Sequence, residues 1–179
     1  MDFDAIQRPC YFRGCYGLIY FVWSVIFVYF AFFNPDKGYC WSQNGSDTPR
    51  PGYEFVSGWQ LVNRQYENWF AWNAILYFIC GIQCLLFTQF RIVDDFFNLG
   101  HKTYLGGRLI MIVWGIVLRA GHDGRMCSGD LYTGDEVRPE PYLWASGKFI
   151  KYNLLYQVLL EVPVMTLLHT FGKQESRFK

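Results

Sequence analysis

An uncharged segment of 20 residues, GCYGLIYFVWSVIFVYFAFF at positions 14–33, constrains the fold more than any other feature of the chain. A helix rises about 1.5 Å per residue, so a helix of this length measures roughly 30 Å, which is the thickness of the hydrocarbon core of a bilayer. Pro35 follows closely and disfavours the helical conformation at Asn34. The sequence therefore predicts that residues 14–33 form a transmembrane helix.

Three further apolar segments, at residues 69–90, 105–120 and 152–171, extend this prediction. The middle one of these is the shortest, because only ten uncharged residues separate Arg108 from Arg119. It spans a bilayer if both arginines extend their charged ends outward to the membrane surface. The alternative is a re-entrant or tilted segment that is packed among protein.

These four segments predict an all-α fold, a polytopic membrane protein in which a bundle of four transmembrane helices forms a single domain over residues 1–179. Residues 34–68 and 121–151 are polar and rich in turn-forming residues, so we expect two long loops on one side of the membrane. Lysines and arginines divide equally between the two sides, so the positive-inside rule does not decide the orientation.

The small and polar residues of the second apolar segment recur on one side of a helix. They are Asn73, Tyr77, Cys80, Gly81, Cys84 and Thr88. Small residues allow two helices to approach closely, and polar residues find hydrogen-bond partners across such a contact. We interpret this stripe as a helix-packing surface, and the alternative is the lining of a polar conduit.

Each of the two long loops contains a single cysteine, Cys40 in the first and Cys127 in the second. The four-span topology puts both on one side, where a disulfide would join the loops if that side is oxidising. The alternative is a pair of thiols. Asn44 begins the tripeptide Asn-Gly-Ser, which is a candidate glycosylation site if its loop faces a secretory lumen. Cys10 and Cys15 are interpreted as thiols or as palmitoylation sites.

Glu161 is the tenth residue of the fourth apolar segment, which would place it near the middle of the bilayer. An acidic side chain at that depth costs about 2.5 to 3.5 kcal/mol on insertion scales. Gln157 precedes it by about one helical turn, so the sequence predicts two intramembrane polar residues. Two interpretations remain open for Glu161: a proton or cation site in a transport path, or a glutamate that is hydrogen-bonded to neighbouring helices or to another subunit.

The sequence contains no motif for catalysis, cofactor binding or metal binding. The three histidines are scattered, and no two cysteines have the Cys-x-x-Cys spacing of a redox pair. A net charge of only +1, without a dense basic run, argues against nucleic acid as a partner. We therefore expect no enzymatic activity, no catalytic, cofactor-binding or metal-binding residues, and no cofactor beyond structural lipids.

The organisation of the chain resembles that of the MARVEL-type four-helix proteins of vesicle and junction membranes. Four apolar segments, two long loops on one side and the single cysteine of each loop carry this resemblance. Gly107-Arg108 and Cys127-Ser128-Gly129-Asp130 are also similar to segments of small four-helix membrane proteins of protists and algae. The resemblance implies membrane organisation or trafficking, with no catalytic residues to carry over.

The function that we expect is that of a non-enzymatic multi-pass membrane protein, a structural or accessory subunit of a larger membrane protein complex such as an organellar respiratory-type assembly. One alternative is a MARVEL-like membrane-organising or trafficking protein, and another is a small proton or cation channel or transporter that uses Glu161. The expected partners are membrane lipid and other membrane protein subunits. The expected location is the mitochondrial inner membrane, ahead of an endomembrane or the plasma membrane.

Overall fold

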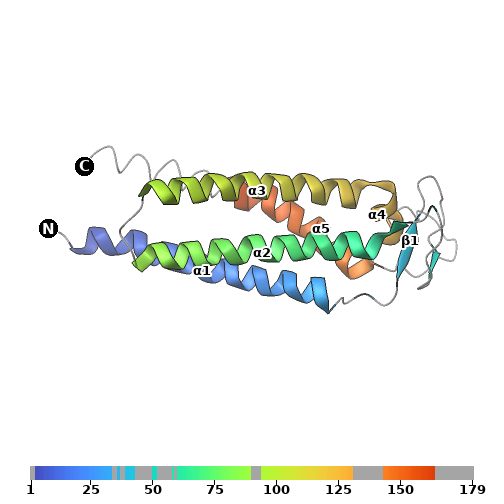
Figure 1. Cartoon of the computed structure of the whole chain (residues 1–179), viewed down its shortest axis with the longest axis horizontal. Coiled ribbons are helices and arrows are strands. Elements are labelled where there is room, and N and C mark those ends of the chain that lie inside the picture. Colours follow the sequence, from blue (N-terminus) through green and yellow to red (C-terminus); the bar gives the residue numbers. More distant parts are fainter. Residues whose placement is uncertain are drawn as a thin grey trace. The chain divides into compact units, whose positions relative to one another are not determined.

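The chain is predominantly helical in the computed structural model, which describes residues 3–33, 36, 39–42, 50–51, 58, 60–89, 94–130 and 143–163. Within the three long helices, the side chains are described over residues 17–33, 62–85 and 104–120. In chain order the elements are α1 (Phe3–Phe32), β1 (Cys40–Ser42), β2 (Arg50–Pro51), β3 (Gln60–Leu61), α2 (Val62–Gln89), α3 (Asp94–Ala120), α4 (His122–Cys127), α5 (Trp144–Tyr156) and the π-helix η1 (Gln157–Glu161) (Figure 1).

The structure corrects the prediction of four transmembrane helices. Among the residues that it describes, no helix is long and apolar enough to cross a membrane. In α3, Arg108 and Arg119 limit the uncharged run to ten residues, which is about 15 Å of helix against the roughly 30 Å of a bilayer core. Residues 14–16, 86–90 and 164–171 of the expected spans lie outside the described side chains.

The same finding corrects two dependent predictions, the class of multi-pass membrane protein and the integral membrane location. The correction does not affect the prediction that these segments are helical. Helices α1, α2 and α3 cover much of the first three apolar segments. In each of them an apolar sequence forms a helix, and the helix buries only part of its circumference.

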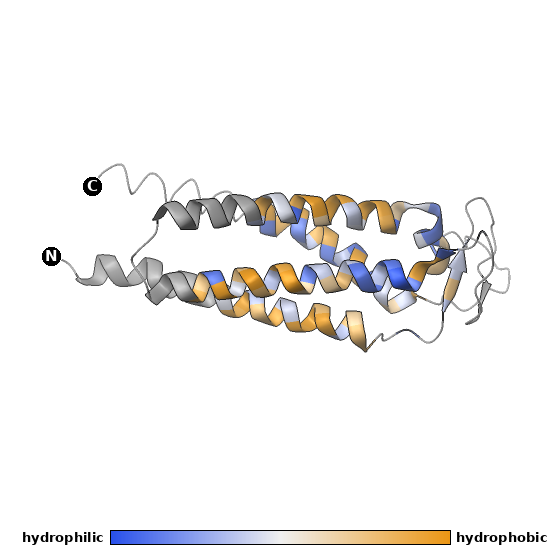
Figure 2. Ribbon diagram, in the orientation of Figure 1, coloured by the Kyte–Doolittle hydropathy of each residue, from blue (hydrophilic) through white to orange (hydrophobic). Residues whose placement is uncertain are grey.

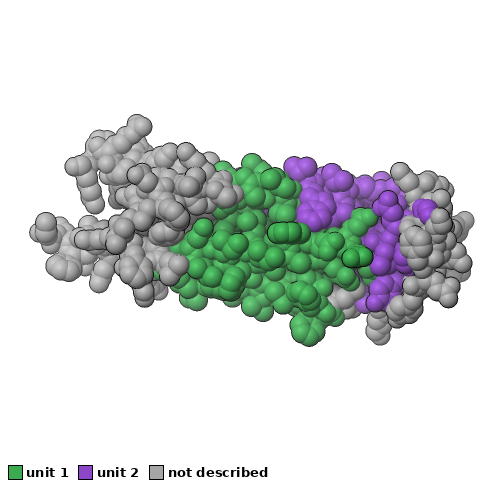
Figure 3. All heavy atoms as spheres, in the orientation of Figure 1, with its two compact units in different colours: residues 1–35, 63–111 green, residues 36–62, 112–179 purple. Residues whose placement is uncertain are grey.

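The contacts divide the chain into two compact units, which Figure 3 shows in separate colours. Unit 1 consists of Met1–Pro35 and Asn63–Met111, and it contains α1, most of α2 and the first part of α3. Unit 2 consists of Asp36–Val62 and Ile112–Lys179, and it contains the strands, the end of α3, α4, α5 and η1.

Aromatic side chains form the core of unit 1. Phe27 of α1 is fully buried, and its ring stacks on that of Tyr77 in α2 with 5.3 Å between centroids. Trp69, also fully buried, meets Phe27 edge-on at 5.7 Å. Such pairs contribute about 0.5–1.5 kcal/mol each beyond the burial of their area. Tyr20 of α1 adds a tilted contact with Tyr77 at 5.9 Å, so α1 and α2 are joined by rings along several turns.

Two glycines allow α1 and α2 to approach closely. A Cβ atom at Gly81 of α2 would lie 3.1 Å from the ring of Phe21. A Cβ atom at Gly17 of α1 would lie 3.1 Å from the side chain of Leu85. Both distances are shorter than ordinary van der Waals contact, so a larger residue at either position would push the helices apart.

Unit 2 contains a small antiparallel sheet that was not expected from the sequence, where residues 34–68 were predicted to be a loop. Its strand order is β2-β1-β3, and Trp41 in the central strand pairs with Arg50 on one side and with Leu61 on the other. The strands are two or three residues long. An alternating pattern cannot be recognised over so few residues, so these strands were not predicted.

Candidate functional site

A buried arginine lies at the centre of unit 1. Arg108 of α3 has only 1% of its surface exposed, although it was expected to extend its charged end outward. Its Nη1 donates a hydrogen bond of 2.8 Å to Oδ1 of Asn73, and its Nη2 donates one to the hydroxyl of Tyr77. The guanidinium carbon also lies 4.1 Å from the centroid of the Tyr77 ring. Hydrogen bonds and a cation–π contact thus offset part of the cost of burying this charge.

The predicted helix-packing stripe of α2 provides these partners. Its members Asn73, Tyr77, Cys80 and Gly81 are buried, and Cys84 is half-buried. The side chain of the sixth member, Thr88, lies outside the described side chains. Asn73 uses both ends of its amide, because Nδ2 donates to the carbonyl of Trp69 at 2.8 Å while Oδ1 accepts from Arg108. The stripe therefore lies against packed side chains of the same unit.

Two further hydrogen bonds connect the helices of unit 1. Ser24 of α1 donates from Oγ to the carbonyl of Ala74 at 2.9 Å, and Trp69 donates from Nε1 to the carbonyl of Met111 at 2.9 Å. Each satisfies a buried polar side chain with a backbone oxygen of another helix. The interior of this unit is polar at several points and its polar side chains have structural partners.

In unit 2 the structure joins Cys40 of β1 to Cys127 of α4 in a disulfide, with their Cα atoms 5.9 Å apart. Both residues are fully buried, and 87 positions separate them in the sequence. Ser42, two residues after Cys40, donates from Oγ to a carboxylate oxygen of Asp123 at 2.6 Å. The central strand of the sheet is thus attached to α4 by one covalent bond and one side-chain hydrogen bond.

The amino terminus of α5 receives its cap from a distant residue. The carboxylate of Asp36 accepts hydrogen bonds from the backbone N–H of Ala145, at 2.7 Å, and of Ser146, at 2.9 Å. Leu143 stands at the capping position of α5 and makes no side-chain capping bond. A carboxylate at a helix amino terminus is favourable because it pairs N–H groups that have no partner within the helix.

Arg119, near the end of α3, is the second arginine that was expected to extend outward, and it is also buried. Its Nε donates to the carbonyl of Gly147 at 2.9 Å, and its Nη2 forms an ion pair of 2.5 Å with Asp130. Within unit 2 this side chain connects the end of α3 to the first turn of α5 and to Asp130, the third residue after α4. A Cβ atom at Gly147 would lie 2.1 Å from Oγ of Ser128, so only glycine fits there.

Three polar side chains form a row on the buried side of α5 and η1. Asn153, Gln157 and Glu161 are 3%, 0% and 8% exposed, and Gln157 donates from Nε2 to Oδ1 of Asn153. Four residues exceed one turn of an α-helix and fall short of one turn of a π-helix, so the change to η1 keeps the three in line. Nδ2 of Asn153 and Oε1 of Gln157 have no hydrogen-bond partner among the described residues.

The position of Glu161 at the middle of a bilayer followed from the fourth expected span, and the correction of that span removes the position. What the structure shows is a buried glutamate at the end of η1, one of the polar residues of unit 2. A proton or cation path was one interpretation of Glu161. In the structure this residue follows two buried amide side chains, those of Asn153 and Gln157, along α5 and η1.

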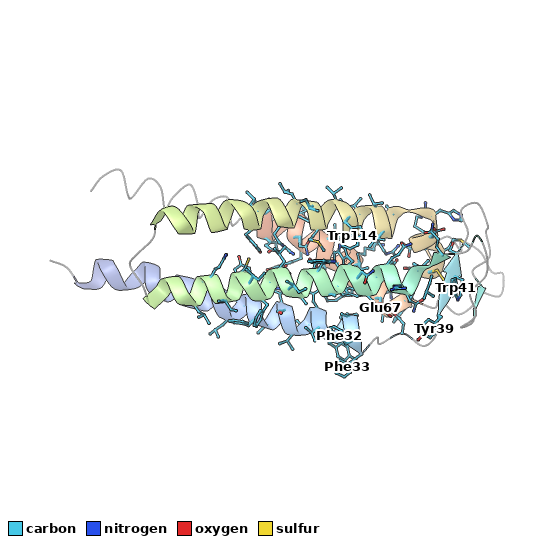
Figure 4. All side chains as sticks on the ribbon, viewed as in Figure 1. Phe32, Phe33, Tyr39, Trp41, Glu67 and Trp114 are labelled. Carbon is cyan, nitrogen blue, oxygen red and sulfur yellow. A yellow bond between two sulfur atoms is a disulfide. The ribbon has the colours of Figure 1, made fainter. Side chains whose placement is uncertain are left out.

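Glu67 of α2 is half-buried, and its burial raises the pKa of the carboxyl above the ordinary value, while the positive charge of Arg64 lowers it. Burial is the larger effect, because removing water from a carboxylate disfavours its charged form. Figure 4 labels this residue near the start of α2.

The outward-facing surfaces of the helices are apolar. Figure 2 shows hydrophobic residues along the described length of α1. The exposed large residues of α1, together with the residue that follows it, are Leu18, Ile19, Val22, Val25, Val28, Tyr29, Phe32 and Phe33. Those of α5 and η1 are Trp144, Tyr152, Leu155, Val158, Leu159 and Leu160. In Figure 4, Phe32 and Phe33 project away from the end of α1. Each unit therefore buries several polar side chains and also exposes many large apolar ones.

Several candidate sites named from the sequence lie outside the described residues. They are the glycosylation site at Asn44 and the side chains of Cys10 and Cys15. Over the described part of the chain, no group of three or more His, Cys, Asp or Glu side chains could hold a metal ion. Sequence reasoning did not find Asp36 as the cap of α5, because its partners are backbone N–H groups more than 100 positions away.

A scan of the chain against protein-family models finds no match, and searches of the curated proteins and of the solved structures find none either. The resemblance to MARVEL-type proteins therefore stays a prediction from the sequence.

Proposed function

We propose that this chain is a non-enzymatic structural subunit of a larger protein assembly, held to its neighbours through the exposed apolar faces of its helices. The single observation that supports this proposal is the apolar outer face of α1. Val25 and Phe32 are 68% and 74% exposed, and Leu18 and Val22 are exposed to a similar degree. Their spacing of three, four and seven residues puts them on one side of the helix.

A continuous face of this kind is unusual on a protein that acts alone. Single exposed apolar residues are normal on a surface, whereas large contiguous patches of them mark interaction sites, among which are the surfaces where another protein binds. The interior of the same unit contains the polar residues Asn73 and Arg108, while large apolar residues of α1 remain exposed. The outer face of α1 is as apolar as an interior surface, which is the character of the interfaces in permanent complexes.

The chemistry of the face indicates the chemistry of the partner. Residues 17–33 contain no charged side chain, so ion pairs cannot direct the contact. A complementary surface must therefore be apolar and must fit by shape, as the ridges of one helix fit the grooves of another. We take the occupant to be an apolar helix of a different subunit of the assembly. The large exposed aromatics at the end of α1, Phe32 and Phe33, are the side chains best suited to anchor it.

A site-specific photo-crosslink tests this proposal. Val25 is replaced with benzoylphenylalanine in the full-length chain, expressed at its natural level in its source cells, and Phe27 is replaced in a matched chain because that position faces the core. Irradiation is expected to join Val25, and not Phe27, to one recurring partner protein. Val25→Asp should abolish recovery of the same partner, while Arg125→Asp, at an exposed site in α4, should not.

Two results would contradict the proposal. A cross-linked product of twice the 21.1 kDa of the chain would mean that α1 contacts a second copy. A native mass equal to that of one chain, with no adduct from Val25, would mean that the face has no protein partner. Recovery of a protein that is not cross-linked at Val25, or that Val25→Asp leaves bound, would also count against it.

A further inference from the structure

We propose that the Cys40–Cys127 disulfide and the Asp36 cap act together as a reduction-sensitive clasp on the first turn of α5. The clasp consists of Asp36, Cys40, Cys127 and the backbone N–H groups of Ala145 and Ser146, all within unit 2. Breaking the disulfide releases the cap, and the first turn of α5 then loses its order while unit 1 keeps its structure.

The Asp36 cap joins residues that lie far apart in the sequence. Asp36 binds N–H groups that follow it by 109 and 110 positions. Forming a hydrogen bond between such distant residues carries the entropic cost of closing a long loop, unless another link has already brought the two segments together. Asp36 stands only four positions before Cys40, whose disulfide is such a link.

Cys127 is in turn connected directly to the start of α5. Its backbone carbonyl accepts a hydrogen bond of 2.9 Å from the N–H of Leu143, the residue that precedes α5. The disulfide thus holds the segment of Asp36 against a residue that is itself bonded to the beginning of α5. This arrangement raises the effective concentration of the Asp36 carboxylate at the helix end without adding any contact of its own.

The residue at the capping position of α5 offers no side-chain cap of its own. Leu143, at the capping position, has no polar side-chain atom and makes no capping bond. Further into the helix, Arg119 donates to the carbonyl of Gly147 and the N–H of Gly147 donates to Leu143. Those bonds do not involve Asp36 or β1, so the loss of order is confined to the N–H groups of Ala145 and Ser146.

The chemical step is an ordinary thiol–disulfide exchange. A dithiol reductant gives two electrons and two protons: the bond between the sulfur atoms of Cys40 and Cys127 breaks, each sulfur becomes a thiol, and the reductant closes to a cyclic disulfide. Both cysteines are fully buried, so the sheet and α4 must first open for the reductant to reach a sulfur atom. The clasp therefore stays closed against brief exposure to reductant and opens under sustained reduction.

Hydrogen exchange of the full-length chain tests the clasp. After quantitative reduction with dithiothreitol, or in the variant with both Cys40→Ser and Cys127→Ser, the N–H groups of Ala145 and Ser146 are expected to exchange about fivefold faster or more, the size of effect typical of losing a cap. The N–H groups of α2 around Asn73 serve as the internal reference and are expected to keep their rates.

Coupling is measured with Asp36→Ala. In the oxidised chain this variant should accelerate the same two N–H groups, and reduction should then add little, because the cap is already gone. Ser42→Ala, which removes the 2.6 Å hydrogen bond between β1 and α4 and keeps the disulfide, should change them less than about twofold. The proposal fails if reduction leaves Ala145 and Ser146 unchanged, accelerates α2 equally, or has its full effect in Asp36→Ala.

Discussion

The guanidinium of Arg108 donates a hydrogen bond of 2.8 Å to the side-chain oxygen of Asn73 inside unit 1. Both residues are almost completely buried, and they lie 35 positions apart on α3 and α2. A buried charge loses the hydration that it has in water, and each hydrogen bond that it donates to a protein group offsets part of this loss. Asn73 is therefore a necessary partner of Arg108 as well as a member of the packing stripe on α2.

Asn73→Leu is expected to lower the free energy of unfolding by about 1–3 kcal/mol, because it leaves a donor of a buried cation without its acceptor. Gln83→Leu, at a half-buried site on the same helix, should change stability by less than about 0.5 kcal/mol. Urea unfolding followed by circular dichroism measures both. Equal effects in the two variants would show that the hydrogen bond to Arg108 contributes nothing particular.

Gly147→Ala is expected to destabilise the chain by about 1–3 kcal/mol, because the new methyl group overlaps the side chain of Ser128. A Cβ atom there would lie 2.1 Å from Oγ and 2.6 Å from Cβ of that serine. The matched control is Gly106→Ala in α3, where a Cβ atom would meet nothing within 4 Å, so the helix propensity of alanine should stabilise by up to about 1 kcal/mol.

Thermal unfolding of the two alanine variants should therefore move in opposite directions. Adding Ser128→Gly to Gly147→Ala removes the overlapping atoms and should recover part of the lost stability. If Gly147→Ala unfolds at the same temperature as the unchanged chain, the start of α5 does not lie as close to Ser128 as the structure indicates.

The sequence could indicate the features that depend on local periodicity or on a count. The polar side of α2 followed from helical spacing, and a disulfide between Cys40 and Cys127 was one of two alternatives because each is the single cysteine of its loop. Arg108 and Arg119 were misjudged because an arginine beside an apolar run usually extends outward, and their actual partners lie on other elements. The Asp36 cap and the short strands depend in the same way on contacts between distant residues.

The membrane interpretation failed for a related reason. The composition of an apolar segment shows that its side chains avoid water, and it does not show what covers them. In α1 the inner side packs on aromatic rings of α2, while the outer side exposes residues such as Val25. The exposed and the buried side of α1 consist of the same types of apolar residue, so the structure is needed to tell which residues are exposed and which are buried.

Glu67 should make stability depend on pH in the acidic range. Its pKa is raised in the folded chain by burial, with Arg64 opposing, so the folded state holds the proton more firmly than the unfolded state. The favourable contribution is complete below the ordinary value of 4.5 and is lost as pH rises through the higher folded value. Glu67→Gln should remove this slope, and thermal unfolding between about pH 4 and pH 7 measures it. An unchanged slope in Glu67→Gln would assign the dependence to other groups.

The two amides on α5 and η1 allow a test of whether their pairing is structural. Gln157 donates to Oδ1 of Asn153, and each amide has one atom without a partner among the described residues. Gln157→Leu removes the donor and leaves Asn153 buried without it, which should cost about 1–3 kcal/mol. Adding Asn153→Leu removes the remaining polar group as well, so the double variant should be more stable than Gln157→Leu alone and close to the unchanged chain. This order follows because two buried polar groups that satisfy each other only in part are less favourable than two apolar groups of similar size. Guanidinium unfolding of the three chains measures it, and a double variant less stable than Gln157→Leu would mean that the Asn153 amide binds something other than Gln157.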